Sequence, residues 1–112
     1  MTYKALARVR HTSGRMNGLE TRYGAFLSER RACGEIIDWK FEAFKLRLAD
    51  NTFYTPDFMV INANREIEIH ETKGFWREDA RIKVKVAAEM FSEFHFVGVQ
   101  WDKRQGWQFE EF

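Results

Sequence analysis

Two short apolar runs joined by a polar linker are the feature that most limits how this chain can fold. Residues 58–61 and 67–70 both carry patterns typical of β-strands. The residues between them, 62–65, are polar and rich in turn formers. A linker this short favours an antiparallel hairpin. Such a hairpin would bring the start of the first strand beside the end of the second.

Charged residues stand at those two strand ends. Pro56 and Asp57 come directly before the first strand, and Glu71, Thr72 and Lys73 follow the second. Because side chains alternate along a strand, Glu71 and Lys73 point to one face and Thr72 to the other. Pro56 indicates an interruption or an edge, which would turn Asp57 toward an open site. The hairpin therefore predicts two carboxylates and one ammonium group on one small patch.

A patch of this kind suits a divalent cation. Two carboxylates a few ångströms apart repel each other, and partial burial raises the cost of ionising both. Mg²⁺ takes carboxylate oxygens as ligands and keeps several of its own waters. Lys73 could then hydrogen-bond a water on the cation or a substrate phosphate. Together these groups indicate the hydrolysis of a phosphodiester bond.

Length and composition limit the class of protein. A chain of 112 residues is expected to form one domain, and its 45% apolar and 16% aromatic residues exclude a disordered chain. No apolar run approaches the roughly 20 residues that span a bilayer, and no charged-then-apolar leader opens the sequence. We therefore expect a soluble, cytoplasmic protein without a membrane partner. The one cysteine, Cys33, allows no internal disulfide, and we expect it to be a small buried residue near a helix end.

Basic residues gather at the beginning of the chain although the net charge is only +1. Before Glu20 there is no acidic residue, while the basic residues there are Lys4, Arg8, Arg10 and Arg15. We interpret residues 1–16 as a basic arm and residues 17–112 as a single domain. The arm could neutralise DNA phosphates, or it could be an ordinary solvated terminus, and the sequence favours neither.

The first predicted helix begins near Leu19, with Asn17 as its cap and Gly34 at its end. Glu20 lies in its first turn, where an acidic side chain suits the helix dipole. Glu20 could also be a third carboxylate that the helix brings to the patch of Asp57 and Glu71. Both interpretations of Glu20 stay open.

The remaining pattern predicts strands around a second helix. Alternation shifts phase between residues 36–42 and 44–48, which indicates a bulge, a bend or two separate strands. A helix is predicted from Glu78 to Phe91, because apolar residues recur at every fourth position in Ile82, Val86 and Met90. Residues 94–101 form a predicted strand, and 107–109 a short edge strand. The fold class is thus α/β (α+β), in the order α-β-β-β-α-β, with a mixed central sheet flanked by helices.

These residues, in this order of elements, resemble the PD-(D/E)XK nuclease superfamily. The likeness rests on Pro56-Asp57, on Glu71-Thr72-Lys73 and on Glu20 in the first helix. It covers about residues 17–101 and is strongest to small phage-encoded endonucleases and Holliday-junction resolvases. The resemblance implies a restriction-endonuclease-like core and a metal-dependent DNA endonuclease, structure-selective or weakly sequence-specific, of a bacterial or phage-infected cell.

The resemblance also implies roles for individual residues. Asp57 and Glu71 would bind the metal, Mg²⁺ or in its place Mn²⁺, and the backbone carbonyl of Thr72 would complete the protein's ligands. Lys73 would position or help to deprotonate the attacking water. Glu20 matches an acidic residue that many members place on the first helix, where it holds metal or water.

Other residues and functions remain as alternatives. Lys83 and Lys85 could contact phosphates, but two lysines on a helix more often form a solvated face. His70 alternates to the opposite face from Glu71, so we expect a structural histidine. The DNA partner would be cut symmetrically by a homodimer, or nicked by a monomer. The alternative function is a non-catalytic DNA-binding or protein-interaction module on the same fold.

Overall fold

The computed structural model describes residues 7–9 and 14–112. In this part of the chain the elements are β1 (Ala7–Val9), α1 (Gly18–Ala32), β2 (Ile36–Phe41), β3 (Phe44–Ala49), β4 (Thr52–Tyr54), β5 (Phe58–Asn62), β6 (Ile67–Thr72), α2 (Glu78–Met90), β7 (His95–Asp102) and β8 (Gly106–Glu111). The predicted α+β domain with a mixed central sheet and flanking helices is confirmed. The predicted order α-β-β-β-α-β is wrong in detail, because five strands, β2 to β6, separate α1 from α2. Neither helix in the described ranges has the length and apolar character to cross a membrane.

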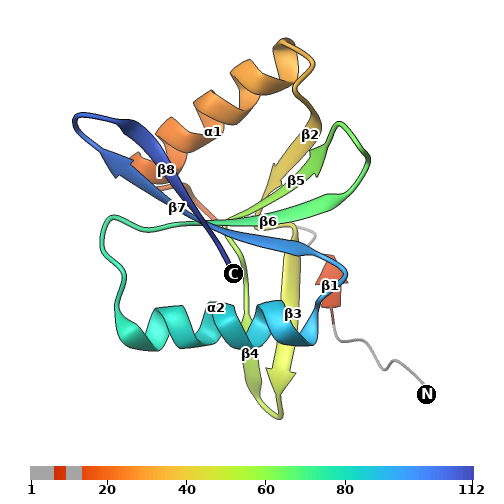
Figure 1. The fold of residues 1–112 in the computed structure, drawn as a ribbon. Coiled ribbons are helices and arrows are strands. Elements are labelled where there is room, and N and C mark those ends of the chain that lie inside the picture. Colours follow the sequence, from red (N-terminus) through yellow and green to blue (C-terminus); the bar gives the residue numbers. More distant parts are fainter. Residues whose placement is uncertain (1–6, 10–13) are drawn as a thin grey trace.

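A five-stranded sheet in the order β2-β5-β6-β7-β8 forms the centre of the fold (Figure 1). Strands β5 and β6 make the predicted antiparallel hairpin, in which Phe58 lies opposite His70. After β6 the chain passes through α2 and returns as β7, which pairs parallel to β6 with Val99 opposite Thr72. This parallel return was predicted. The edge strand β8 is also confirmed, and it is longer than the predicted 107–109.

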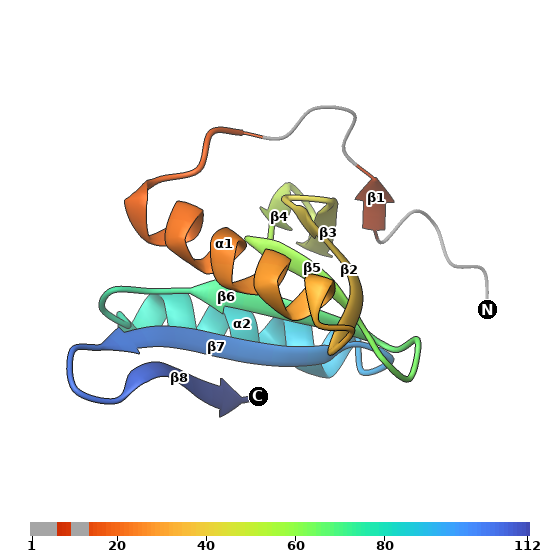
Figure 2. The same cartoon turned by 90° about the horizontal axis from the view of Figure 1, so that it is seen from above.

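Helix α1 covers one face of this sheet and α2 covers the other, as Figures 1 and 2 show. Side chains alternate along β5, so Phe58 joins the core beneath α1 while Met59 joins the core beneath α2. Tyr23 is the largest buried residue contributed by α1, and Val84 is buried on α2. The same alternation divides the polar residues of β6 between the two faces.

The phase shift near residue 43 separates two strands that belong to different sheets. Strand β2 lies in the five-stranded sheet, whereas β3 pairs with β1 and β4 in a second, three-stranded sheet. Glu42 lies between β2 and β3 with a φ of 49°, so the backbone turns there through the left-handed region. Leu46 of β3 is buried in the core beneath α2. After β4, the last strand of the second sheet, the chain passes through Asp57 and enters β5 of the central sheet.

The ends of α1 follow the sequence signals. The Asn17 side chain accepts a hydrogen bond of 2.8 Å from the Glu20 amide, and Gly34 follows the helix with a φ of +79°. Glycine adopts that left-handed backbone without a steric cost. Cys33 lies at the C-cap, and the expectation that it is buried is wrong, because the last turn of α1 is exposed to solvent.

Helix α2 forms where predicted, but its buried face differs from the predicted one. Val84 and Ala87 are buried, whereas Ile82, Val86 and Met90 are 51%, 41% and 42% exposed. Residues 84 and 87 are three positions apart and therefore lie on one side of a helix, as do residues four apart. The sequence holds two apolar stripes on α2, and the stripe that contains Val84 and Ala87 is the one that packs on the sheet.

Candidate active site

Asp57 lies opposite Glu71 because the hairpin register continues past its last paired residues. Phe58 pairs with His70, so one further step outward places Asp57 beside Glu71. The Asp57 side chain is anchored through Oδ2, which accepts hydrogen bonds from the Thr72 amide at 2.9 Å and from Thr72 Oγ1 at 2.8 Å. Only 8% of Asp57 is exposed. The hairpin therefore brings the two predicted carboxylates together.

Glu71 is anchored in the same way through one of its two oxygens. Its Oε1 accepts hydrogen bonds from Tyr54 Oη at 2.9 Å and from the Asp57 amide at 3.0 Å. Its Oε2 lies 3.2 Å from Lys73 Nζ, so Lys73 points to the same face as Glu71, as alternation predicted. Lys73 is partly exposed, whereas Glu71 is buried. The two carboxylates and the ammonium group form the predicted patch.

Each carboxylate commits one oxygen to hydrogen bonds from backbone amides and hydroxyl groups, while the second oxygen of Asp57 stays open and that of Glu71 is paired with Lys73. Within the described residues, Asp57 Oδ1 accepts no hydrogen bond, and Glu71 Oε2 contacts only Lys73. Hard divalent cations bind through such carboxylate oxygens. Two buried carboxylates that each present an oxygen fit a cation of this kind, with the Thr72 carbonyl as the predicted further ligand.

The electrostatics of the pair favour a bound cation. Burial, and next the neighbouring Glu71 carboxylate, raise the pKa of Asp57 to about 8. Burial also raises the pKa of Glu71, although Lys73 acts in the opposite direction. At neutral pH the pair therefore resists full ionisation without a counter-charge. A divalent cation would supply that counter-charge and allow both carboxylates to ionise.

Tyr54 is a site residue that the sequence did not identify. Its hydroxyl donates to Glu71 Oε1, and burial followed by the Glu71 charge raises the pKa of this hydroxyl well above its usual value. Tyr54 therefore remains protonated and serves as a donor. A tyrosine at the end of the strand before Pro56 was the available signal, but nothing in the sequence placed its ring beneath Glu71.

Glu20 lies at the N-terminus of α1 and completes a capping box. Its Oε1 accepts a hydrogen bond of 2.9 Å from the Asn17 amide. Its negative charge is among the smaller causes that raise the pKa of Asp57. In the described part of the chain, no three acidic, histidine or cysteine side chains are grouped to hold a metal. The structure thus shows the helix-capping role of Glu20, and its role as a metal ligand stays a prediction.

The predicted phosphate-binding residues are placed differently from one another. Lys83 Nζ lies 6.0 Å from the centroid of the Tyr54 ring, on the face that carries Glu71. Lys85 and Arg15 are exposed. The side chain of Arg8 and the whole of Arg10 lie outside the described residues. Lys83 therefore lies near Tyr54, the residue whose hydroxyl binds Glu71.

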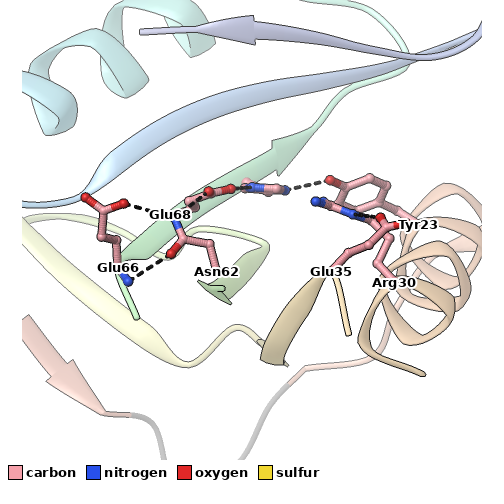
Figure 3. Close-up of polar contacts among 7 residues, drawn as sticks. Tyr23, Arg30, Glu35, Asn62, Glu66 and Glu68 are labelled. Carbon is pink, nitrogen blue, oxygen red and sulfur yellow. Dashed lines mark hydrogen bonds and ion pairs between the residues drawn. The ribbon is translucent and has the colours of Figure 1, made fainter. Parts of the chain in front are cut away.

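His70 belongs to a separate polar chain on the α1 face. Its Nδ1 lies 2.6 Å from Tyr23 Oη, and its Nε2 lies 2.8 Å from Glu68 Oε1. Asn62 Nδ2 donates to Glu68 Oε2 at 2.9 Å, and Figure 3 shows Tyr23, Glu68 and Asn62 along this chain. The hydrogen bond with His70 has the largest effect on the pKa of Glu68 and lowers it, whereas burial acts in the opposite direction. The pKa of Glu68 is lowered to about 2. The prediction of a structural histidine is confirmed.

A cavity of about 380 Å³ lies beside this polar chain and not beside the carboxylate pair. His70 and Glu68 line it together with Phe26 and Phe109. His70 and Glu68 are hydrogen-bonded to each other, and the second ring nitrogen of His70 is taken by Tyr23. We therefore place the candidate chemistry at Asp57 and Glu71, where carboxylate oxygens remain available.

Three segments surround the carboxyl end of β6, where the site lies. The start of α1, the connection from β6 to α2 and the turn between β7 and β8 occupy the same end of the sheet in Figures 1 and 2. The Lys73 amide donates to the Val99 carbonyl at 2.9 Å, which ties the exit from β6 to β7.

No family model, curated protein or solved structure matches the chain. The functional argument therefore depends on the geometry of the site.

Proposed function

We propose that this protein is a metal-dependent nuclease that hydrolyses phosphodiester bonds in DNA. The observation that carries the proposal is the buried pair of Asp57 and Glu71, in which one oxygen of Asp57 stays open and Glu71 Oε2 is paired with Lys73 Nζ at 3.2 Å. Two carboxylates and an adjacent ammonium group match what phosphodiester hydrolysis requires.

Asp57 and Glu71 would hold Mg²⁺ or Mn²⁺, with the Thr72 carbonyl as the third protein ligand. A cation bound there would lower the pKa of water and offset the charge that develops on the phosphate. Thr72 and Tyr54 orient the two carboxylates, since Thr72 donates to Asp57 Oδ2 and Tyr54 donates to Glu71 Oε1, which would leave the other two oxygens to the cation. This arrangement holds the acidic oxygens in position before substrate arrives.

Lys73 has a role distinct from that of the carboxylates. Its ammonium group is held by Glu71 in the free protein. With a cation bound at Glu71, Lys73 would be available to the attacking water or to the phosphate, and its partly exposed position permits this movement. Lys83 lies on the same face, on α2, and would contact a phosphate further along the strand.

The order of elements supports a restriction-endonuclease-like assignment within the PD-(D/E)XK superfamily. A helix precedes the hairpin that carries the carboxylates, and a second helix leads to a parallel strand. The complete set of Asp57, Glu71 and Lys73 favours an enzyme over a non-catalytic binding module on the same fold. The negative charge of Glu20 also contributes to the raised pKa of Asp57, which supports its proposed place among the acidic groups of the site.

The test is cleavage by the whole chain of linear duplex, single-stranded, flap and four-way-junction DNA in the presence of Mg²⁺ or Mn²⁺. We expect cleavage that chelation abolishes and that Asp57→Asn reduces by orders of magnitude, while DNA binding is retained. Asp38→Asn is the matched control, because Asp38 is an acidic residue in β2 that is paired with Arg31 and lies away from the site. Undiminished cleavage by Asp57→Asn would overturn the proposal.

A further inference from the structure

The connection between β6 and α2 exposes a large aromatic ring beside the site. Phe75 is 77% exposed, and the next most exposed large apolar residue in the described ranges, Ile82, reaches 51%. Phe75 follows Gly74 and lies two residues after Lys73. Leaving a phenyl ring in water forgoes the free energy of its burial. An exposed ring so close to the candidate site is available to contact a bound substrate.

The segment that carries Phe75 is anchored on both sides. Before it, the Lys73 amide is hydrogen-bonded to the backbone of β7 at 2.9 Å. After it, Trp76 packs over β7, where a Cβ added at Gly98 would come within 2.8 Å of the Trp76 ring. The Arg81 guanidinium lies 5.7 Å from the Trp76 ring centroid. The Trp76 ring thus packs this loop against β7, whereas the Phe75 ring is exposed to solvent.

Cationic and aromatic side chains stand at the same end of the sheet. The Arg22 guanidinium of α1 lies 4.6 Å from the Trp101 ring centroid, at the end of β7. Lys103 and Arg104 are exposed in the turn that joins β7 to β8. Figures 1 and 2 place this turn, the start of α1 and the connection after β6 at one end of the molecule. Cations and rings in combination are how proteins bind unpaired nucleic-acid strands.

We propose that Phe75 stacks on an unpaired or unstacked base next to the phosphate that is cut, and so makes the enzyme prefer branched DNA to continuous duplex. This inference rests on the proposed nuclease function. Two residues span at most about 7 Å of extended chain, and successive nucleotides rise about 3.4 Å along a strand. Phe75 therefore reaches a base within about two nucleotides of a phosphate held at Lys73.

The preference for branched DNA follows from the cost of exposing a base. In a continuous duplex the base must first leave its stack, whereas at a branch point or a mismatch this costs less. Where this cost exceeds the gain from stacking, as in a continuous duplex, the base stays in its stack and makes no contact with Phe75. Stacking on Phe75 therefore gives a larger net gain on branched DNA, and removing the ring should lower the ratio of the two cleavage rates.

The experiment compares cleavage of a four-way junction and of a linear duplex with the same arm sequence, at limiting protein concentration with Mg²⁺. We expect Phe75→Ala to lower the junction-to-duplex rate ratio roughly 5- to 150-fold, which is the equivalent of about 1–3 kcal/mol for stacking on one base. Phe75→Trp should retain the ratio. Ile37→Ala is the control, because Ile37 is 48% exposed and adjoins Ile36, which pairs with Asn62 at the end of β5 remote from Asp57.

The outcomes separate this inference from the proposed function. If the wild-type protein cleaves both DNAs and Phe75→Ala leaves their ratio unchanged, the stacking role is wrong while the nuclease remains. If the ratio falls equally in Ile37→Ala, the effect is not specific to Phe75 and the inference is overturned as well. If the wild-type protein cleaves no DNA with Mg²⁺ or Mn²⁺, both proposals fail.

Discussion

The buried carboxylate pair should make the metal-free protein less stable as the pH rises. The pKa of Asp57 is raised from an ordinary value of about 4 to about 8. Between these values the folded protein binds a proton that the unfolded chain has released. The free energy of unfolding therefore falls with increasing pH across this window. Most acidic residues that form ion pairs in a folded protein have the opposite effect.

The size of this effect follows from the linkage relation. One proton corresponds to at most about 1.4 kcal/mol per pH unit, so the change from pH 5 to pH 7 is at most about 2.7 kcal/mol. With the m-values usual for small domains, that is a shift of the urea midpoint on the order of 1–2 M. Glu71 titrates together with Asp57, because its pKa is raised as well. Urea unfolding in a chelating buffer measures the slope.

Asp57→Asn isolates the contribution of this carboxylate. The asparagine oxygen can still accept the two hydrogen bonds from Thr72, so the fold should persist. We expect the variant to be more stable than the wild type at pH 7 without metal, with a flatter pH dependence. Mg²⁺ at 100 times its dissociation constant should stabilise the wild type by about 2.7 kcal/mol and leave the variant unchanged.

Asp38 provides the matched control. Its pKa is lowered by the Trp39 amide and by Arg31, so its charge favours the folded state, and Asp38→Asn should leave the slope between pH 5 and pH 7 as it is. The reasoning is refuted if Asp57→Asn and the wild type show the same slope, or if Mg²⁺ stabilises both equally. Either result would mean that Asp57 carries no buried, cation-responsive charge.

Three further predictions concern neighbouring residues. Lys73→Ala should reduce cleavage by orders of magnitude. Mn²⁺ binding, measured by calorimetry, should be retained or tightened, because the Lys73 ammonium group no longer competes for Glu71 Oε2. Loss of Mn²⁺ binding would contradict the separate roles of Lys73 and the carboxylates. Tyr54→Phe should lower the free energy of unfolding by about 1–3 kcal/mol and slow cleavage about tenfold, since Glu71 loses a buried donor. Tyr23→Phe should cost a similar free energy in urea unfolding, because it leaves His70 Nδ1 without its partner, yet cleavage should be unchanged; an equal loss of cleavage would connect the two faces.

Local patterns were sufficient to predict how the polar residues divide between the faces of the sheet. Strict alternation along β6 separated His70 from Glu71 and joined Lys73 to Glu71, and the short turn before β6 placed Asp57 opposite Glu71. These inferences hold because the period of a strand and the span of a tight hairpin allow few alternatives. The ends of α1 were predictable for a similar reason, since capping depends on a few adjacent residues.

Contacts between distant segments were settled only by tertiary packing. Alternation did not show that Tyr54 holds Glu71, that α2 buries Val84 in place of Ile82, or that β3 leaves the central sheet. Each depends on how whole elements pack, and two stripes of one helix can be nearly equal in hydrophobicity while only one fits the sheet. The sequence by itself determined which groups share a face of β6, while the tertiary structure decided which of their oxygens stay available and that Phe75 is left in solvent.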